Sequence, residues 1–258
     1  MQNLKTRARW IATALALSCL SVPPADSARA AEIHQAKGVV ELFTSQGCSS
    51  CPAADEVLKE LADRKGDVLT LAWHVDYWDY LGWKDTFGSE QNSDRQRAYA
   101  RSLGERQIYT PQAIINGRMH VVGSRSEAVN TALEEFEGTA NGIQVPIEVR
   151  QDGDTLKISV AATAQSADAT LWMVYYDDHR DVDVERGENR GQKLAYTNIV
   201  RAVEMIGMVK DRDIQTEFKL GELGRRGHDS CALILQKNTS EGTPGAIVGA
   251  AFIQNFGI

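Results

Sequence analysis

The chain has 258 residues, of which 43% are hydrophobic and 24% charged, so it is long enough for one or two globular domains with buried cores. Its formal net charge of −7 at pH 7 argues against a nucleic acid as partner, because phosphate backbones bind basic surfaces. Composition and charge therefore favour a globular protein that does not bind nucleic acids.

Residues 1–30 have the features of a secretory signal peptide. They contain a basic start, an apolar run over residues 10–20 and the small-x-small cleavage signal Ala28-Arg29-Ala30. This apolar run is too short to cross a bilayer stably, so we expect no stable membrane span after cleavage. We therefore expect a periplasmic or secreted protein whose mature chain has lost Cys19 and keeps three cysteines.

The most informative stretch runs from Val39 to Pro52, an apolar strand that leads through a polar turn into two cysteines three residues apart. Residues 52–64 then predict a helix with one apolar face. Two cysteines at this spacing can form a disulfide where the backbone bends, as it does in the first turn of a helix. Free N–H groups at a helix start favour a thiolate, so we assign Cys48, expected nearer the exposed end, as nucleophile and Cys51 as resolving thiol.

A structural disulfide and a zinc site are the alternatives for this pair. A closed zinc site needs four ligands, and the mature chain offers only Cys231 as a further cysteine, so a four-cysteine site is excluded. A loop this short constrains the unfolded chain weakly, which makes stability a poor reason for the pair. We favour a redox couple that works without a metal or a cofactor.

The next segment is almost continuously apolar. Residues 67–75 predict a strand buried on both faces, paired in parallel with the strand before the cysteines. Residues 76–83 follow with four large aromatic rings. Because ligands bind beyond the carboxyl ends of parallel strands, Tyr77 and Trp78 are candidate substrate-binding residues; a packed aromatic loop is the equal alternative.

Two capping boxes and a hairpin complete the first half of the chain. The capping boxes that open at Ser93 and Ser124 each predict a helix. Residues 108–122 predict a hairpin whose two strands meet at the turn Asn116-Gly117. Residues 37–139 are thus predicted to run strand, helix, strand, helix, strand, strand, helix.

At this point the chain resembles the thioredoxin superfamily. Cys48-Ser49-Ser50-Cys51 stands in the place of its redox motif and Thr110-Pro111 in the place of its cis-proline. More closely, the chain is similar to a bacterial family of secreted thioredoxin-like proteins of unknown function. The segments that carry this closer similarity are residues 41–52, 74–79, 109–112 and 186–189.

The resemblance implies a role for each of several residues. Cys48 and Cys51 would exchange disulfides with proteins, and Thr110 with Pro111 would bind the substrate backbone as an added strand. Glu41 resembles the buried acid that related oxidoreductases keep beneath the disulfide; an exposed glutamate at a sheet edge is the alternative. The serines between the cysteines match neither reductants nor strong oxidants, so the direction of exchange stays open.

Residues 143–258 change character and predict an all-β sandwich-like domain. Its expected strands are residues 143–149, 155–161, 170–176, 214–220, 231–236 and 246–254. The polar loop at 186–192 is either a rim over the disulfide or a structured turn. Cys231 is interpreted as a buried residue that behaves as a small hydrophobe. The predicted fold is therefore α/β, a thioredoxin-like domain with a helical insertion followed by this β-rich domain.

We predict an exported thiol–disulfide oxidoreductase that acts on protein thiols or disulfides and works with a membrane or soluble redox partner. One alternative is a periplasmic Cu(I) chaperone that uses the same cysteines with His74 or Met119-His120, since soft thiolates select Cu(I). Another alternative is a redox-silent interaction module whose disulfide stays closed.

Overall fold

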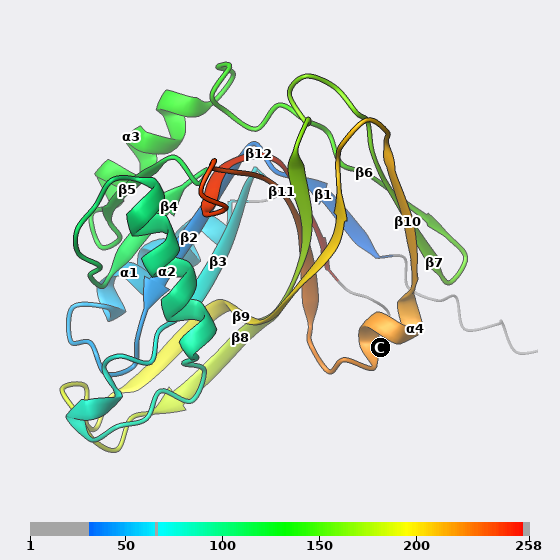
Figure 1. Ribbon diagram of the computed structural model, residues 1–258. Coiled ribbons are helices and arrows are strands. Elements are labelled where there is room, and N and C mark those ends of the chain that lie inside the picture. Colours follow the sequence, from blue (N-terminus) through cyan, green and yellow to red (C-terminus); the bar gives the residue numbers. More distant parts are fainter. Residues whose placement is uncertain (1–30, 65–66, 255–258) are drawn as a thin grey trace, which may run out of the picture.

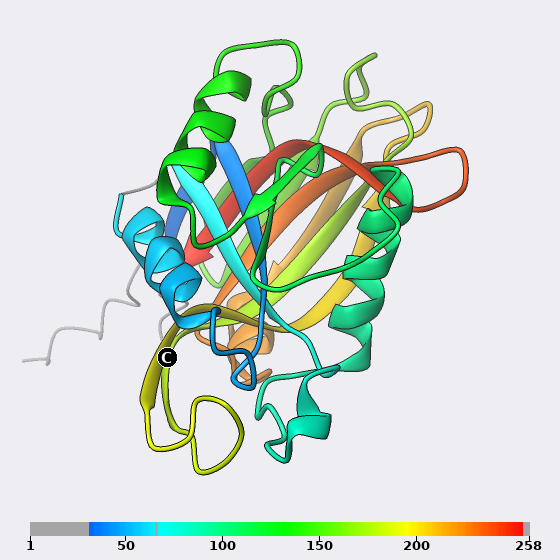
Figure 2. The same ribbon diagram turned by 90° about the vertical axis from the view of Figure 1, so that its left-hand side faces the viewer.

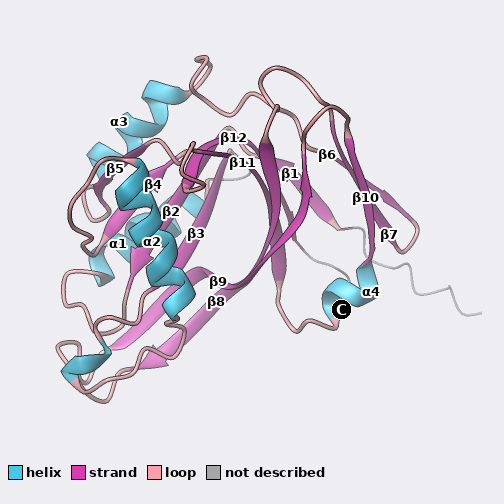
Figure 3. Cartoon of the chain, viewed as in Figure 1, coloured by secondary structure: helices cyan, strands magenta, loops and turns pink. Residues whose placement is uncertain are grey.

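The structure is a computed structural model that describes residues 31–64 and 67–254. The signal peptide predicted for residues 1–30 lies outside the described residues. Within those ranges the chain forms twelve strands and four α-helices, arranged as a large curved sheet, a smaller sheet and helices on both faces of the large one (Figures 1 and 3).

The first half of the chain forms the α/β part of the large sheet. Its elements are β2 (Gly38–Thr44), α1 (Pro52–Ala62), β3 (Val68–His74), the short 3₁₀ helix η1 (Asp79–Leu81), α2 (Glu90–Ser102), β4 (Gln112–Ile115), β5 (Met119–Val122) and α3 (Ser126–Phe136). The strands lie in the order β3-β2-β4-β5. β2 pairs with β3 in parallel and with β4 antiparallel, so it is a central strand, and all of its residues are buried.

The helices divide between the two faces of this part. Figure 2 shows α1 and α3 on one side of the strands and α2 on the other. Alternation along β2 sends Val40 and Leu42 toward α1 and α3, where they pack with Leu58 and Val129. The alternate residues Val39, Glu41 and Phe43 face α2, where Phe43 packs with aromatic neighbours.

Both helices that were predicted from capping boxes begin elsewhere. The N-cap of α2 is Ser89, whose extended backbone lets its hydroxyl accept a hydrogen bond from the Asn92 N–H. The hydroxyl of Ser93 donates instead to Asp76, at 2.5 Å. Helix α3 begins at Ser126 without a side-chain cap. Predicted capping at Ser93 and Ser124 was therefore wrong, at Ser93 because that hydroxyl has another partner.

The second half of the chain is rich in strands, as predicted, and it continues the same large sheet. Its elements are β6 (Glu148–Asp152), β7 (Thr155–Val160), β8 (Ala169–Asp183), β9 (Lys193–Met208), β10 (Ile214–Lys219), α4 (Leu220–Gly224), β11 (Ser230–Asn238) and β12 (Pro244–Gln254). β1 (Glu32–Gln35) pairs with β12, and β9 pairs in parallel with β3. The full order is β1-β12-β11-β8-β9-β3-β2-β4-β5. Sequence patterns did not predict β1, β9 or α4.

The small sheet, β10-β7-β6, covers the end of the large sheet that lies away from α1 and α2 (Figure 1). Between the sheets is a core that includes Leu156, Ile158, Leu171, Met173 and Leu233. This region has the two-layer packing of a sandwich, with one layer shared with the α/β part.

The turn at Asn116-Gly117 is confirmed, and it gives a matched test of local crowding. Gly117 and Gly153 both have positive φ. A Cβ on Gly117 would lie 2.3 Å from the Gly245 carbonyl oxygen. A Cβ on Gly153 would have none of the described atoms within 4 Å. We expect G153A to lower the free energy of unfolding by about 1–2 kcal/mol. G117A should lower it by about 1–3 kcal/mol more, because backbone must move. Urea denaturation measures both; equal losses would contradict the crowding.

Candidate functional site

The two cysteines of the motif form a disulfide at the start of α1. Cys51 is the N-cap residue of the helix and Pro52 its first residue. The Cys51 N–H donates to the Cys48 carbonyl oxygen, which closes the turn between them and leaves their Cα atoms 5.4 Å apart. The spacing of the cysteines therefore predicted this local structure.

The disulfide is nevertheless covered. Cys48 is 1% exposed and Cys51 fully buried, while Ser49 and Ser50 between them are exposed. Sequence reasoning placed Cys48 nearer the exposed end, but its sulfur meets little solvent. The Ser50 hydroxyl lies 3.4 Å from the Cys48 Sγ.

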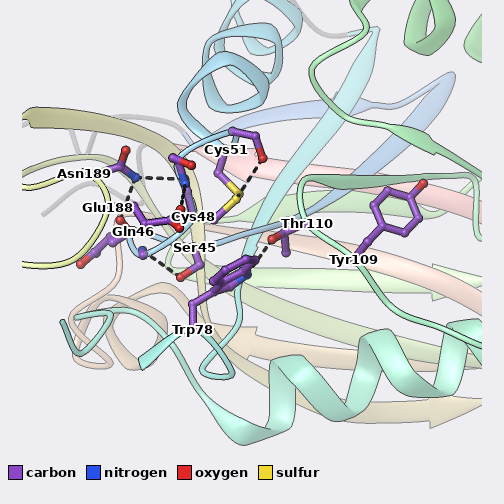
Figure 4. The surroundings of a disulfide bond; sticks show 12 residues. Ser45, Gln46, Cys48, Cys51, Trp78, Tyr109, Thr110, Glu188 and Asn189 are labelled. Atoms are coloured by element: carbon purple, nitrogen blue, oxygen red, sulfur yellow. Dashed lines mark hydrogen bonds between the residues drawn. A yellow bond between two sulfur atoms is a disulfide. The ribbon is translucent and has the colours of Figure 1, made fainter. Parts of the chain in front are cut away.

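A loop from the β-rich half lies on the cysteine turn. The Asn189 side-chain amide donates to the carbonyl oxygens of Gln46 and Cys48, both at 2.9 Å, and is itself buried. The Glu188 carboxylate accepts the Ser49 N–H at 3.1 Å. The Ser49 side chain and then this N–H lower the pKa of Glu188. These residues belong to the loop between β8 and β9, and Figure 4 shows them beside the disulfide. The loop thus contacts the site directly.

Aromatic residues and Thr110 lie on the other side of the disulfide. The Trp78 indole N–H donates to the Thr110 hydroxyl at 2.7 Å (Figure 4). A Cβ on Gly47 would lie 3.0 Å from the Trp78 Cβ, so a glycine there leaves room for the tryptophan. The peptide bond between Thr110 and Pro111 is cis, as the resemblance implied. Tyr80, stacked on Trp78, is 77% exposed.

Tyr77 lies next to Trp78, with ring centroids 6.3 Å apart. Its hydroxyl donates to the Gln96 side chain of α2 at 3.0 Å, and burial raises the pKa of the phenol to about 12. Of the predicted substrate-binding residues, Trp78 and Thr110 thus lie at the disulfide, and Tyr77 lies beside Trp78 while its hydroxyl is bonded to α2.

Gln46 connects the cysteine turn with the segment after the aromatic residues. Its backbone N–H donates to Asp85, and its buried side chain accepts from the Trp83 indole and donates to the Thr86 hydroxyl, each at 2.8 Å. This connection was not predicted, because no local pattern links Gln46 with residues about forty positions away.

A group of buried polar side chains lies under the start of α1. His74 binds Asp85 through Nδ1 at 2.9 Å; burial alone would raise the pKa of Asp85, but His74 and backbone N–H donors outweigh burial and hold it below its usual range. Among the described residues, no hydrogen-bond partner reaches the Asp55 carboxylate, the Thr44 hydroxyl, the His74 Nε2 or the Tyr196 hydroxyl. Burial raises the pKa of Asp55 to about 7, and the charge interaction with His74 opposes this rise.

Glu41 is fully buried, not an exposed glutamate at a sheet edge. Its carboxylate accepts hydrogen bonds from Arg95 Nε at 2.7 Å and from the Tyr99 hydroxyl, both on α2. Alternation along β2 places Glu41 on the face opposite Thr44, and Thr44 faces Asp55. Asp55 was missed in the sequence. Its position four residues after Cys51, on the apolar face of a predicted helix, was the available signal.

Two further candidates from the sequence are His120 and Cys231. His120 lies 2.9 Å from the Tyr109 hydroxyl, and Cys231 is a free, buried thiol whose pKa is raised by burial. In the part of the chain that the structure describes, no three histidine, cysteine, aspartate or glutamate side chains are grouped to hold a metal ion. None of the helices in that part has the length and apolar character needed to cross a membrane.

Fold and site together define an α/β protein with a covered disulfide at the start of a helix. The chain belongs to the family described as "Protein of unknown function (DUF1223)", whose model matches residues 39–236. It is also similar to a protein of Agrobacterium tumefaciens with an X-ray crystal structure. The two are 39% identical with a TM-score of 0.75, over 85% of this chain and 94% of that one. A search of curated proteins found no match.

The raised pKa of Asp55 predicts a pH-dependent gain in stability from Asp55→Asn. The pKa lies near 3.8 in the unfolded chain and near 7 in the folded one, so the folded protein loses stability as pH rises from about 4 to 7. This loss reaches about 4 kcal/mol above pH 7. D55N has no such carboxyl group, so its free energy of unfolding should exceed that of wild type by up to this amount at pH 8 and by little at pH 4.

Denaturant unfolding of the oxidised proteins at both pH values checks this prediction. The control is D63N, which alters an exposed aspartate at the end of the same helix and should follow wild type at both. A difference between D55N and wild type that does not change with pH would contradict the burial of a carboxylate without partners.

We expect Asn189 to limit how fast a reductant reaches the disulfide. N189A removes the donor to two carbonyl oxygens, which should cost about 1–3 kcal/mol of stability and speed reduction of the disulfide by a phosphine several-fold. E188Q keeps an oxygen that can accept from Ser49 and should stay within about twofold of wild type. Maleimide labelling and mass spectrometry follow the reaction; an unchanged rate in N189A would show that this loop does not limit access.

Proposed function

We propose that this protein is an exported thiol–disulfide oxidoreductase of the thioredoxin superfamily that acts on protein thiols through Cys48 and Cys51. The observation that carries the proposal is the disulfide at the first turn of α1, with Trp78 and Thr110 beside it (Figure 4). A cysteine pair in such a turn is suited to open and close, because a loop of this length adds little to stability.

Strand order supports the superfamily assignment. A parallel pair around α1 and a hairpin before α3, in the strand order β3-β2-β4-β5, agree with the run of elements predicted for residues 37–139. The backbone of Thr110, next to Pro111, would then bind an extended substrate segment as an added strand.

The exchange proceeds through a mixed disulfide. A substrate thiolate attacks the Cys48 Sγ, the bond to Cys51 breaks, and its electron pair stays on the Cys51 Sγ, which takes up a proton. A second substrate thiolate then attacks the substrate sulfur of the mixed disulfide and releases Cys48 as a thiolate. Two electrons pass from the substrate to the protein, and the reverse sequence reduces a substrate disulfide.

Asp55 is suited to supply the proton that Cys51 needs. The two residues lie one turn apart on the buried side of α1, and the Asp55 N–H donates to the Cys51 carbonyl oxygen. A carboxyl group with a pKa of about 7 can give and take a proton near neutral pH. His74, bound to Asp85, faces the same carboxylate and stabilises its charged form.

The residues that cover the sulfurs limit how a partner protein can approach them. Because Cys48 is 1% exposed, attack on its sulfur requires Trp78 or the loop that carries Glu188 to move aside. The Glu188 contact is exposed and the exposed Tyr80 ring lies beside Trp78, so a protein partner can compete for both.

Redox titration and trapping test the proposal. In glutathione buffers the pair should titrate with a potential between roughly −120 and −270 mV, the range of exchange-active proteins. The purified protein should oxidise a reduced model protein or reduce insulin, and C48A should abolish this. C51A should accumulate mixed disulfides, which appear as higher bands on non-reducing gels.

C231S is the matched control, since it removes a cysteine that is buried away from the disulfide in the core between the sheets. It should retain full activity. A potential below about −300 mV, with no exchange by the wild-type protein, would overturn the proposal and leave a permanently closed structural bond.

A further inference from the structure

A cavity of about 580 Å³ lies on the α2 side of the large sheet, away from α1. It forms where β9 leaves β3, since the two strands pair only at Ala72 and Ile199 (Figure 1). Its walls are the start of α2, the segment before that helix, and β9 residues 200–203. The volume is in the range of sites that bind small organic molecules.

The lining of this cavity is basic. Of the residues that the structure describes, Arg95 from α2 and Arg201 from β9 line it, and no aspartate or glutamate does. This is notable in a chain whose net charge is −7. Two guanidinium groups on opposite walls create a local preference for anions that the protein as a whole does not have.

The two arginines differ in how many of their N–H donors already form hydrogen bonds within the protein. Arg95 binds Glu41 through Nε and Tyr99 and Gln236 through Nη2, and no hydrogen bond among residues 31–64 and 67–254 uses its Nη1. Arg201 forms no hydrogen bond within those ranges, and its one ion pair there, to Asp177, is long at 3.8 Å. Arg201 therefore has donors to offer a ligand.

The other lining residues add a donor and an apolar surface. The Trp73 indole N–H is buried and has no partner among the described residues. The Arg95 guanidinium lies over the Trp73 ring, with its Cζ 4.6 Å from the ring centroid. The Arg201 guanidinium lies over the Phe87 ring at 5.1 Å. Val203 is 38% exposed at this cavity. These features match a ligand that joins an anionic group to an apolar body.

We propose that this cavity binds a small organic carboxylate, with the carboxylate between Arg201 and Arg95 and an aromatic or aliphatic body against Phe87 and Val203. Planar guanidinium groups pair well with carboxylates. Most of the lining comes from rigid elements, so the site is largely preformed. It is separate from the disulfide and does not depend on the proposed redox function.

Titration of the ¹⁵N-labelled mature protein with benzoate, followed by NMR, tests the proposal. The indole N–H signal of Trp73 should shift and saturate with benzoate, and benzamide, which has the same shape without the charge, should produce no saturable shift. R201Q should weaken benzoate binding about tenfold or more. R225Q, which removes an exposed arginine of α4's end, should bind within about twofold of wild type.

V203D is a second variant, because it places a carboxylate at a partly exposed position of the cavity and leaves both arginines intact. It should abolish benzoate binding while the NMR spectrum stays folded. Equal binding of benzamide and benzoate, or unchanged benzoate binding in both R201Q and V203D, would overturn the proposal.

Discussion

The arrangement of the site depends on the contact between β9 and β3. The two strands pair in parallel at Ala72 and Ile199, and the Asn198 side chain reinforces this contact by donating to the Thr70 carbonyl and hydroxyl oxygens. Asn198 has a φ of 52°, a conformation that asparagine adopts more readily than most residues. This one connection joins the β-rich half of the chain to the α/β half within a single sheet.

Three features of the molecule follow from that connection. The hairpin of β8 and β9 extends beyond the sheet, so its loop brings Asn189 onto the cysteine turn. The same hairpin places Tyr196 against His74, with ring centroids 4.6 Å apart. Farther along, β9 leaves β3 and opens the cavity that contains Arg201. Residues distant in sequence thus meet at both candidate sites.

The two buried acids near β2 show opposite solutions to the same problem. Glu41 is compensated by Arg95 and Tyr99, so its charge has partners on α2. Asp55 lies on the other face, and no residue of the described ranges donates a hydrogen bond to its carboxylate. The partners of Glu41 compensate the cost of burying its charge, whereas the cost of burying the Asp55 charge remains. An uncompensated buried acid of this kind is expected at a site of proton transfer.

Local patterns predicted the elements whose stabilising contacts are close in sequence. The cysteine turn, α1, and the hairpin at Asn116 follow from spacing, amphipathicity and turn chemistry, and all are present. β9 was missed because polar residues such as Thr197 and Asn198 interrupt its apolar pattern. Asn189 lies 141 residues from the cysteine it contacts, so no local pattern could assign its role. Glu41 was predicted as the acid at the disulfide from resemblance, whereas Asp55, the acid of the proposed exchange, lies on the helix and had no counterpart in that resemblance.

The pairing of β1 with β12 has a consequence for the order in which the protein is completed. Glu32 lies opposite Gln254, so the edge strand formed by some of the earliest described residues has its neighbour only after almost the whole chain has been made. The segment around the cysteines has β2, β3, β4 and β5 available by residue 122. The cysteine turn can therefore form before Asn189 is in place, and both sulfurs stay uncovered until the β-rich half has folded against them.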